Sequence, residues 1–161
     1  MAVTVTAPTQ RSARTGRPGL IGVLGRRWPT GVGIAATTAS MAVVAPLPDR
    51  LQGWLAAFGV LTAAVIYLTW GTARGELTDR RWLTAQTAAV LAFGAVAITA
   101  AAVMVVTPDA ARYLLAAAWL AHAGWDAVHH RAGRVVPRWY AEACLACDVL
   151  LATALLLVGA L

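Results

Sequence analysis

The sequence has 161 residues, of which 60% are hydrophobic and 12% are charged. Soluble domains usually carry about 25% charged residues, so the composition excludes an ordinary soluble globular domain. The 13 arginines outnumber the 7 acidic residues, which gives a net charge of +6. The arginines fall between apolar blocks, however, and this position argues against a nucleic-acid-binding protein. The chain contains no Lys, which also excludes a retinal-linked pump that works through a Schiff base.

The chain begins with a polar, basic stretch. Residues 1–28 are predicted to form a disordered cytoplasmic tail, because they combine Arg with Ala, Thr and Pro and contain few large apolar side chains. The short apolar segment just before Arg26 and Arg27 suits a position on the membrane surface. Residues 29–161 are predicted to form a single transmembrane domain.

Five apolar blocks follow the tail, and each is near the roughly 20 residues that a helix needs to cross a bilayer. They cover residues 29–47, 51–73, 82–106, 110–129 and 139–161. Gly and hydroxyl residues dilute the first block, although such small residues are common where membrane helices pack closely. Pro and Asp in the short connections predict sharp stops and new helix starts. The predicted fold is therefore all-α, a polytopic bundle of five transmembrane helices.

The arginines predict the orientation of this bundle. Eleven of them precede the first block or follow the second and fourth blocks, whereas the other side receives only Arg50 and Arg112. Cytoplasmic loops of membrane proteins are enriched in basic residues. The sequence thus predicts a multi-pass protein of the bacterial plasma membrane with a cytoplasmic N-terminus and an external C-terminus.

Histidines and acids gather in the last two blocks. His122, Asp126 and His129 share one helical face, because they are four and three residues apart. Glu142 is predicted to lie level with Asp126 across the hairpin, and Asp148 close to the midplane of the membrane. An acid at the centre of a membrane helix costs about 3 kcal/mol, so these side chains are expected to face the bundle interior. All five are candidate catalytic residues.

These residues also have structural interpretations. Asp126 can simply be a partner for His130. His129 can cap the end of its helix together with nearby arginines and contact lipid head groups. Glu142 can act as a favourable charge in the first turn of its helix. Asp148 can serve helix–helix specificity instead of chemistry. The sequence leaves these alternatives open.

Aromatic residues accompany the same segment. Trp119 and Trp125 lie in the fourth block beside the His/Asp face, and Trp139 and Tyr140 open the fifth. Trp139 also suits the aromatic belt at the membrane interface. Aromatic faces stabilise cations by roughly 0.5–2 kcal/mol each. These four residues are therefore candidate substrate-binding residues for chemistry that passes through a carbocation.

No metal or cofactor is expected. Cys144 and Cys147 supply two ligands, whereas structural zinc sites usually have four. The sequence contains no Asp-rich motif for magnesium and diphosphate, and three histidines fall short of the His-rich clusters of membrane di-iron enzymes.

The region from Ala121 to Leu151 resembles a known group of membrane enzymes. It contains a Trp-Asp-x-x-His-His segment, then Pro-x-Trp-Tyr and a Cys-x-x-x-Asp helix. In this it resembles the small integral-membrane terpene cyclases of actinobacterial drimentine-type meroterpenoid pathways. The resemblance implies acid-initiated, metal-independent cyclisation of a prenylated, lipid-like substrate in the bilayer, with Asp126, Glu142 and Asp148 as candidate acids.

Two other classes of function fit the same residues. A proton-coupled carrier or channel subunit would also place Asp and His inside a helical bundle. A non-catalytic accessory protein would use the Gly- and Ala-rich helices to bind a larger membrane partner. The sequence does not choose between these alternatives and the cyclase.

Overall fold

The computed structural model describes residues 25–157, and these form an all-helical bundle, as the sequence predicts. Its elements are α2 (Trp28–Val44), α3 (Asp49–Ala73), the 3-10 helix η1 (Glu76–Thr78), α4 (Arg80–Val103), α5 (Pro108–Ala132) and α6 (Arg138–Leu157). Nearly all of the predicted N-terminal tail, including the segment expected on the membrane surface, lies outside the described residues.

Local chemistry explains where several of these helices begin and end. The Asp79 side chain accepts a hydrogen bond from the backbone N–H of Arg81 and so caps the start of α4. Pro108 occupies the first turn of α5, where its missing N–H costs nothing. Gly133 ends α5 in the left-handed conformation, with a φ of 63°, which Gly adopts without steric cost.

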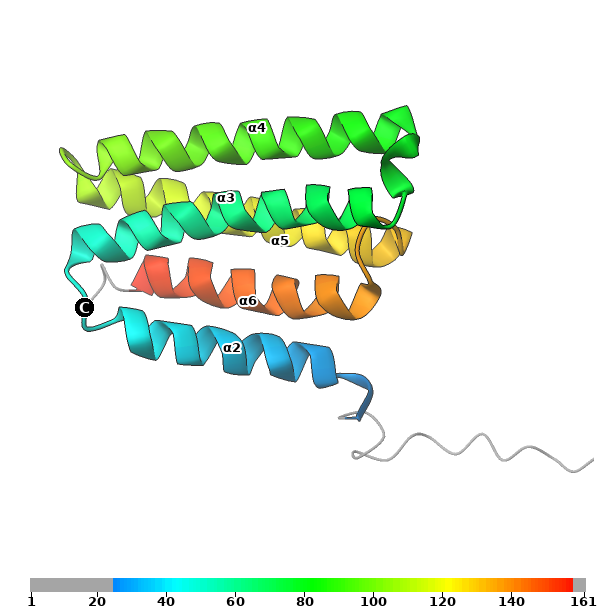
Figure 1. Cartoon of the computed structure of the whole chain (residues 1–161). Coiled ribbons are helices and arrows are strands. Elements are labelled where there is room, and N and C mark those ends of the chain that lie inside the picture. Colours follow the sequence, from blue (N-terminus) through cyan, green and yellow to red (C-terminus); the bar gives the residue numbers. More distant parts are fainter. Residues whose placement is uncertain (1–24, 158–161) are drawn as a thin grey trace, which may run out of the picture.

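The helices are arranged around α5 (Figure 1). The α5–α6 pair is the most extensive interface of the bundle, because a short turn joins the two helices as antiparallel neighbours. On one side α3 and α4 pack against each other and against α5, and on the other side α2 packs against α6. Helix α2 makes no comparable interface with α3. This arrangement leaves space between α2 and α3.

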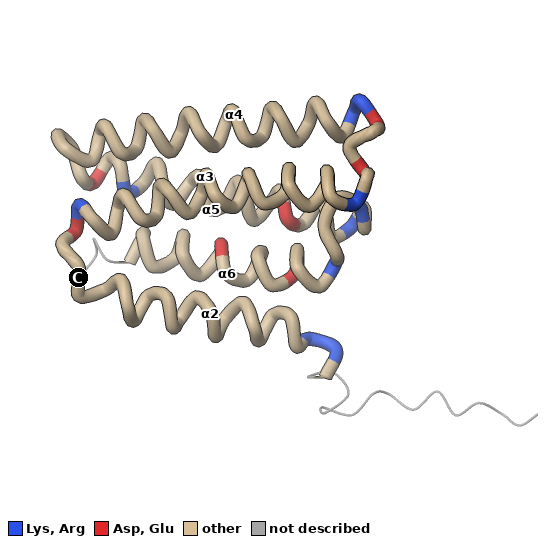
Figure 2. The backbone as a smooth tube through the Cα atoms, in the orientation of Figure 1, with Lys and Arg blue, Asp and Glu red and all other residues tan. Residues whose placement is uncertain are grey.

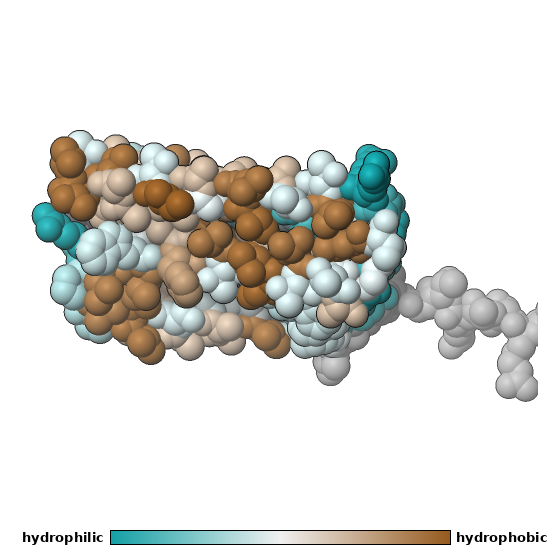
Figure 3. All heavy atoms as spheres, turned by 45° about the horizontal axis from the view of Figure 1, so that its top comes forward, coloured by the Kyte–Doolittle hydropathy of each residue, from teal (hydrophilic) through white to brown (hydrophobic). Residues whose placement is uncertain are grey.

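Charge and hydropathy divide the bundle along its length. Arg and acidic residues gather mainly at its two ends (Figure 2), and the surface between them is largely apolar (Figure 3). Within residues 25–157, three helices are long and apolar enough to cross a membrane, namely α3, α4 and α6. At 17 residues, α2 is shorter than the predicted block. Helix α5 is less apolar because it carries the buried polar residues described below.

Close contact between α2 and α6 depends on a glycine. A Cβ added at Gly33 would overlap the backbone carbonyl of Ala143, whereas one added at Gly31 would meet nothing within 4 Å. Gly33→Ala is therefore expected to lower the free energy of unfolding by about 1–3 kcal/mol, because the two backbones must move apart. Unfolding of the purified protein in detergent measures this change. Gly31→Ala is the matched control, and equal effects of the two variants would contradict the interpretation.

Candidate functional site

The polar face predicted for the fourth block points into the bundle. His122, Asp126 and His129 on α5 each have 0% of their surface exposed. Asp148 on α6 is also buried, at 2%. Burial of this face is confirmed for all three α5 residues, and the spacing of four and three residues explains it.

Three helices bring four side chains together in this interior. His122 Nδ1 lies 2.7 Å from Asp148 Oδ2 and 3.7 Å from Asp126 Oδ1. The Tyr67 hydroxyl on α3 donates a hydrogen bond to Asp126 Oδ1. We call Tyr67, His122, Asp126 and Asp148 the acid–histidine cluster. Two carboxyl groups thus lie near the same imidazole nitrogen, and a phenol binds one of them.

Within residues 25–157, the ionisable side chains of this cluster form hydrogen bonds and ion pairs only with one another. In the described part of the chain, neither Asp126 nor Asp148 forms an ion pair with an arginine. Ionisation of both carboxyls would therefore leave more buried negative charge than one imidazole can balance, which is costly. Two buried atoms, His122 Nε2 and Asp126 Oδ2, have no hydrogen-bond partner among residues 25–157. These atoms are free to give or accept a proton.

His129 has a different role from His122. Its Nδ1 lies 2.9 Å from the backbone oxygen of Trp125, which can only accept, so Nδ1 carries the hydrogen. Its Nε2 then accepts from the side-chain amide of Gln86 at 2.7 Å. With both ring nitrogens engaged, His129 is a neutral, fixed side chain next to the cluster and has no free atom for proton transfer.

Glu142 lies apart from the cluster. Its carboxylate accepts hydrogen bonds from Thr30 at 2.6 Å and from Arg27 at 3.2 Å, and His130 Nε2 lies 3.7 Å away. Glu142 precedes Asp148 by six residues, which places the two side chains about 120° apart around α6. The structure therefore does not bring Glu142 beside Asp126. It connects α6 to α2 and to the end of α5.

The aromatic candidates divide between the interior and the surface. Trp119 packs edge-on to His122, with ring centroids 6.5 Å apart, and Trp125 packs against His129 at 4.7 Å. Tyr140 lies beside Tyr67, at 6.3 Å. Trp139, in contrast, is 43% exposed and stacks on Trp28. Three of the four predicted aromatic residues therefore surround the interior, and Trp139 takes a position typical of the membrane interface.

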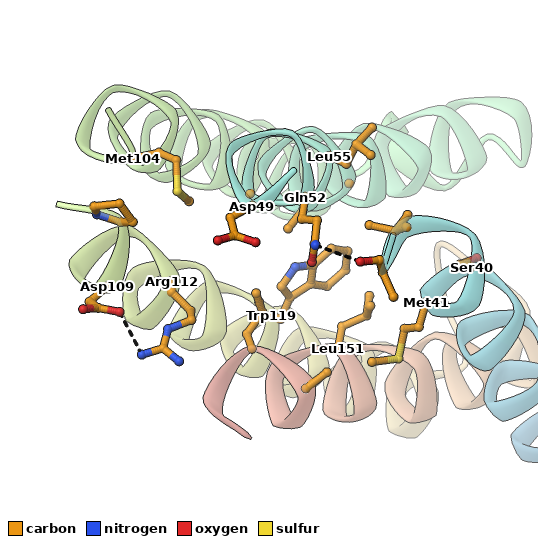
Figure 4. A pocket seen from close by; sticks show the side chains of 18 residues that line it. Ser40, Met41, Asp49, Gln52, Leu55, Met104, Asp109, Arg112, Trp119 and Leu151 are labelled. Carbon is orange, nitrogen blue, oxygen red and sulfur yellow. Dashed lines mark hydrogen bonds and ion pairs between the residues drawn. The ribbon is translucent and has the colours of Figure 1, made fainter. Parts of the chain in front are cut away.

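A cavity of about 570 Å³ lies next to this interior, between α2, α3, α5 and α6. Figure 4 shows the side chains that line it, with Trp119 between α3 and α6. Trp119 both lines the cavity and packs against His122, so its indole connects the cavity wall to the acid–histidine cluster.

The cluster is spaced for hydrogen bonding. One ligand atom from each of His122, Asp126 and Asp148 lies within 4.8 Å of the others, so the group is also a candidate metal site. Ligands of one tetrahedral zinc ion, bound at 2.0–2.2 Å, would lie roughly 3.4 Å apart. The 2.7 Å between His122 Nδ1 and Asp148 Oδ2 is a hydrogen-bond distance instead. As arranged here, these two atoms form a hydrogen bond and are not joint ligands of one zinc ion.

Two side chains of this interior were not among the sequence candidates. Gln86 is the single amide within the apolar block of residues 82–106, and polar residues at such positions usually have a partner in the bundle. That signal could have identified it. Tyr67 also lies in an apolar block, but its partner, Asp126, is 59 residues away in the sequence. No local pattern predicts that pairing.

Comparison with protein-family models, curated proteins and solved structures finds no match to this chain. Its function must therefore be inferred from the geometry of the cluster and the cavity.

Proposed function

We propose that this protein is an integral membrane enzyme that cyclises an isoprenoid chain by protonating one of its double bonds. The observation that best supports the proposal is the grouping of Asp126 and Asp148 around Nδ1 of His122, in a buried interior rich in aromatic rings. A carboxylic acid kept away from water can deliver a proton to an alkene, and the same exclusion protects the carbocation from water.

Asp126 is the proposed proton donor. Tyr67 holds its Oδ1, which leaves Oδ2 as the oxygen that can carry and release the proton. The π electrons of the alkene form the new C–H bond, and the cation on the neighbouring carbon is attacked by the next double bond, which closes the ring. Asp148 orients His122 through Nδ1, so that Nε2 can accept the proton lost in the final step. This proton returns from His122 to the neighbouring Asp126 before the next turnover, which restores both groups.

The product of this sequence is an isomer of the substrate, because one proton is gained and one is lost. No metal or cofactor is needed for any step. The rings of Tyr67, Phe93 and Trp119 surround His122, at centroid distances of 5.5, 5.2 and 6.5 Å, and their faces can stabilise the migrating positive charge. For a substrate in the cavity to reach Asp126, the side chain of Trp119 must move.

We propose that all five described helices cross the bacterial plasma membrane. Along the middle of α5, the polar residues His122, Asp126 and His129 are buried in the bundle and do not face lipid. The connections after α3 and α5, together with the helix ends that flank them, carry most of the described arginines, at the end of the bundle where α2 begins (Figure 2). The rule for basic loops places that end in the cytoplasm.

Reporter fusions test this orientation. Fusions after Gly75 and after Arg134 are expected to report a cytoplasmic location, and a fusion after Leu161 an external one. A cytoplasmic report from the C-terminal fusion would contradict the five-helix topology. With a cytoplasmic N-terminus, such a report requires an even number of spans.

The activity is tested with membranes that contain the wild-type protein. They are incubated with a farnesylated or geranylated acceptor, and the products are searched for a ring-closed isomer of unchanged mass. Membranes without the protein are the control. Wild-type membranes that never convert such acceptors would contradict the cyclase proposal and favour a proton-coupled carrier or an accessory protein.

A further inference from the structure

The cavity described above is mostly apolar, but its mouth is charged. Leu55, Met104 and Leu151 contribute apolar surface to its wall, whereas Arg112 and Asp109 on α5 lie together at one side (Figure 4). The space lies where α2 and α3 do not pack against each other. A long apolar molecule could therefore enter it sideways from the surrounding lipid.

Arg112 is bound only in part by its own chain. Its side chain is 13% exposed, and its Nη2 contacts Asp109 Oδ1 at 3.2 Å. Its Nε and Nη1 are buried and have no hydrogen-bond partner within residues 25–157. The indole Nε1 of Trp119, which also lines the cavity, has none either.

All of these unpartnered atoms are hydrogen-bond donors. A guanidinium group binds phosphate and carboxylate oxygens well, because its planar N–H groups match their geometry. The carboxylate of Asp109 does not fill this role, since its side chain is 86% exposed and contacts a different nitrogen. Asp49, the other acid of the cavity, is exposed to solvent, which weakens its repulsion of an anion.

We propose that this cavity binds a single-chain amphiphile with a phosphate or carboxylate head group. Arg112 binds the head group, and the apolar chain extends along α5 toward Trp119, seven residues and about 10 Å away. Ligand pockets typically measure about 300–1,000 Å³, so a cavity of about 570 Å³ suits one chain better than a two-chain phospholipid. This binding does not depend on cyclisation. If both proposals hold, Arg112 anchors the substrate.

Isothermal titration calorimetry on the purified full chain in neutral detergent tests the proposal. The ligands are farnesyl phosphate, farnesol, inorganic phosphate and phosphatidylglycerol. Farnesyl phosphate is expected to bind at least about 10-fold more tightly than each of the other three, because it alone offers both an anion and a single chain. Equal binding of farnesol would exclude the anion site, equal binding of phosphate would exclude the chain site, and equal binding of phosphatidylglycerol would exclude the size limit.

Three variants locate the site. Arg112→Gln is expected to weaken the binding of farnesyl phosphate at least about 10-fold and to leave the binding of farnesol unchanged. Arg50→Gln removes an exposed arginine from the first turn of α3, at the same end of the bundle, and should leave the binding of both ligands unchanged. Asp109→Asn is expected to tighten the binding of farnesyl phosphate, because it removes a negative charge that contacts Arg112 Nη2.

Asp109→Asn also protects the test against misfolding, since this side chain is largely exposed and its replacement should not disturb the fold. Equal losses in the two arginine variants, or an unchanged affinity after Asp109→Asn, would overturn the proposal. Asp126→Asn should bind farnesyl phosphate normally. If cyclisation is absent but binding is intact, only the proposed enzymatic function is contradicted, and the binding proposal stands.

Discussion

Membranes that contain the Asp126→Asn variant are expected to lose cyclisation by a factor of about 10²–10⁴. Asparagine matches the shape of aspartic acid but has no acidic proton to transfer. Its amide oxygen can still accept the hydrogen bond from Tyr67, so the variant should fold and insert normally. The rate of ring-closed product formation, compared at equal amounts of protein in the membrane, measures the effect.

Other acids serve as comparisons for this variant. Glu76→Gln changes a carboxylate that pairs with Arg134 at 2.8 Å, away from the cluster, and should leave turnover unchanged. Asp148→Asn keeps an oxygen that can accept a hydrogen bond from His122 Nδ1. This variant should therefore lose less turnover than Asp126→Asn. If Glu142→Gln abolished turnover while Asp126→Asn did not, the donor would lie at the contact of α6 with α2.

Much of the fold follows from the spacing of apolar blocks. The predicted block of residues 51–73 corresponds to α3 (Asp49–Ala73), and the other described helices also begin close to their predicted starts. Pro and Asp in the connections interrupt apolar runs, and this signal is local in sequence. The positions of α2 and α3 relative to each other, and with them the cavity, depend on packing between distant segments and could not be predicted from those signals.

The site was predictable along one helix and less so between helices. Helical periodicity alone places His122, Asp126 and His129 on a common face, and the structure buries all three. Helical periodicity does not determine which neighbouring helix faces that side of α5. The expected level of Glu142 with Asp126 favours Glu142 over Asp148 as an acid of the site, but in the structure Asp148 meets His122 and Glu142 contacts Thr30. The partner of each acid is a property of the packed bundle.

Loss of the central imidazole is expected to have the largest effect on stability. His122→Leu should lower the free energy of unfolding by about 3–5 kcal/mol, because it leaves Asp148 buried without its partner. Leucine adds no polar atom that could replace the bond to Nδ1. Denaturant or thermal unfolding in detergent, followed by circular dichroism, measures the change.

The double variant His122→Leu/Asp148→Leu separates this explanation from a simple packing defect. Removing both partners leaves no buried polar group without a bond at that point, so the double variant should be more stable than His122→Leu alone. Ala121→Leu, at an exposed position on the same helix, is the control for adding a leucine to α5 and should be nearly neutral. A double variant that loses the sum of the two single losses would show that His122 and Asp148 do not depend on each other, and that volume, not the unpaired acid, determines the cost.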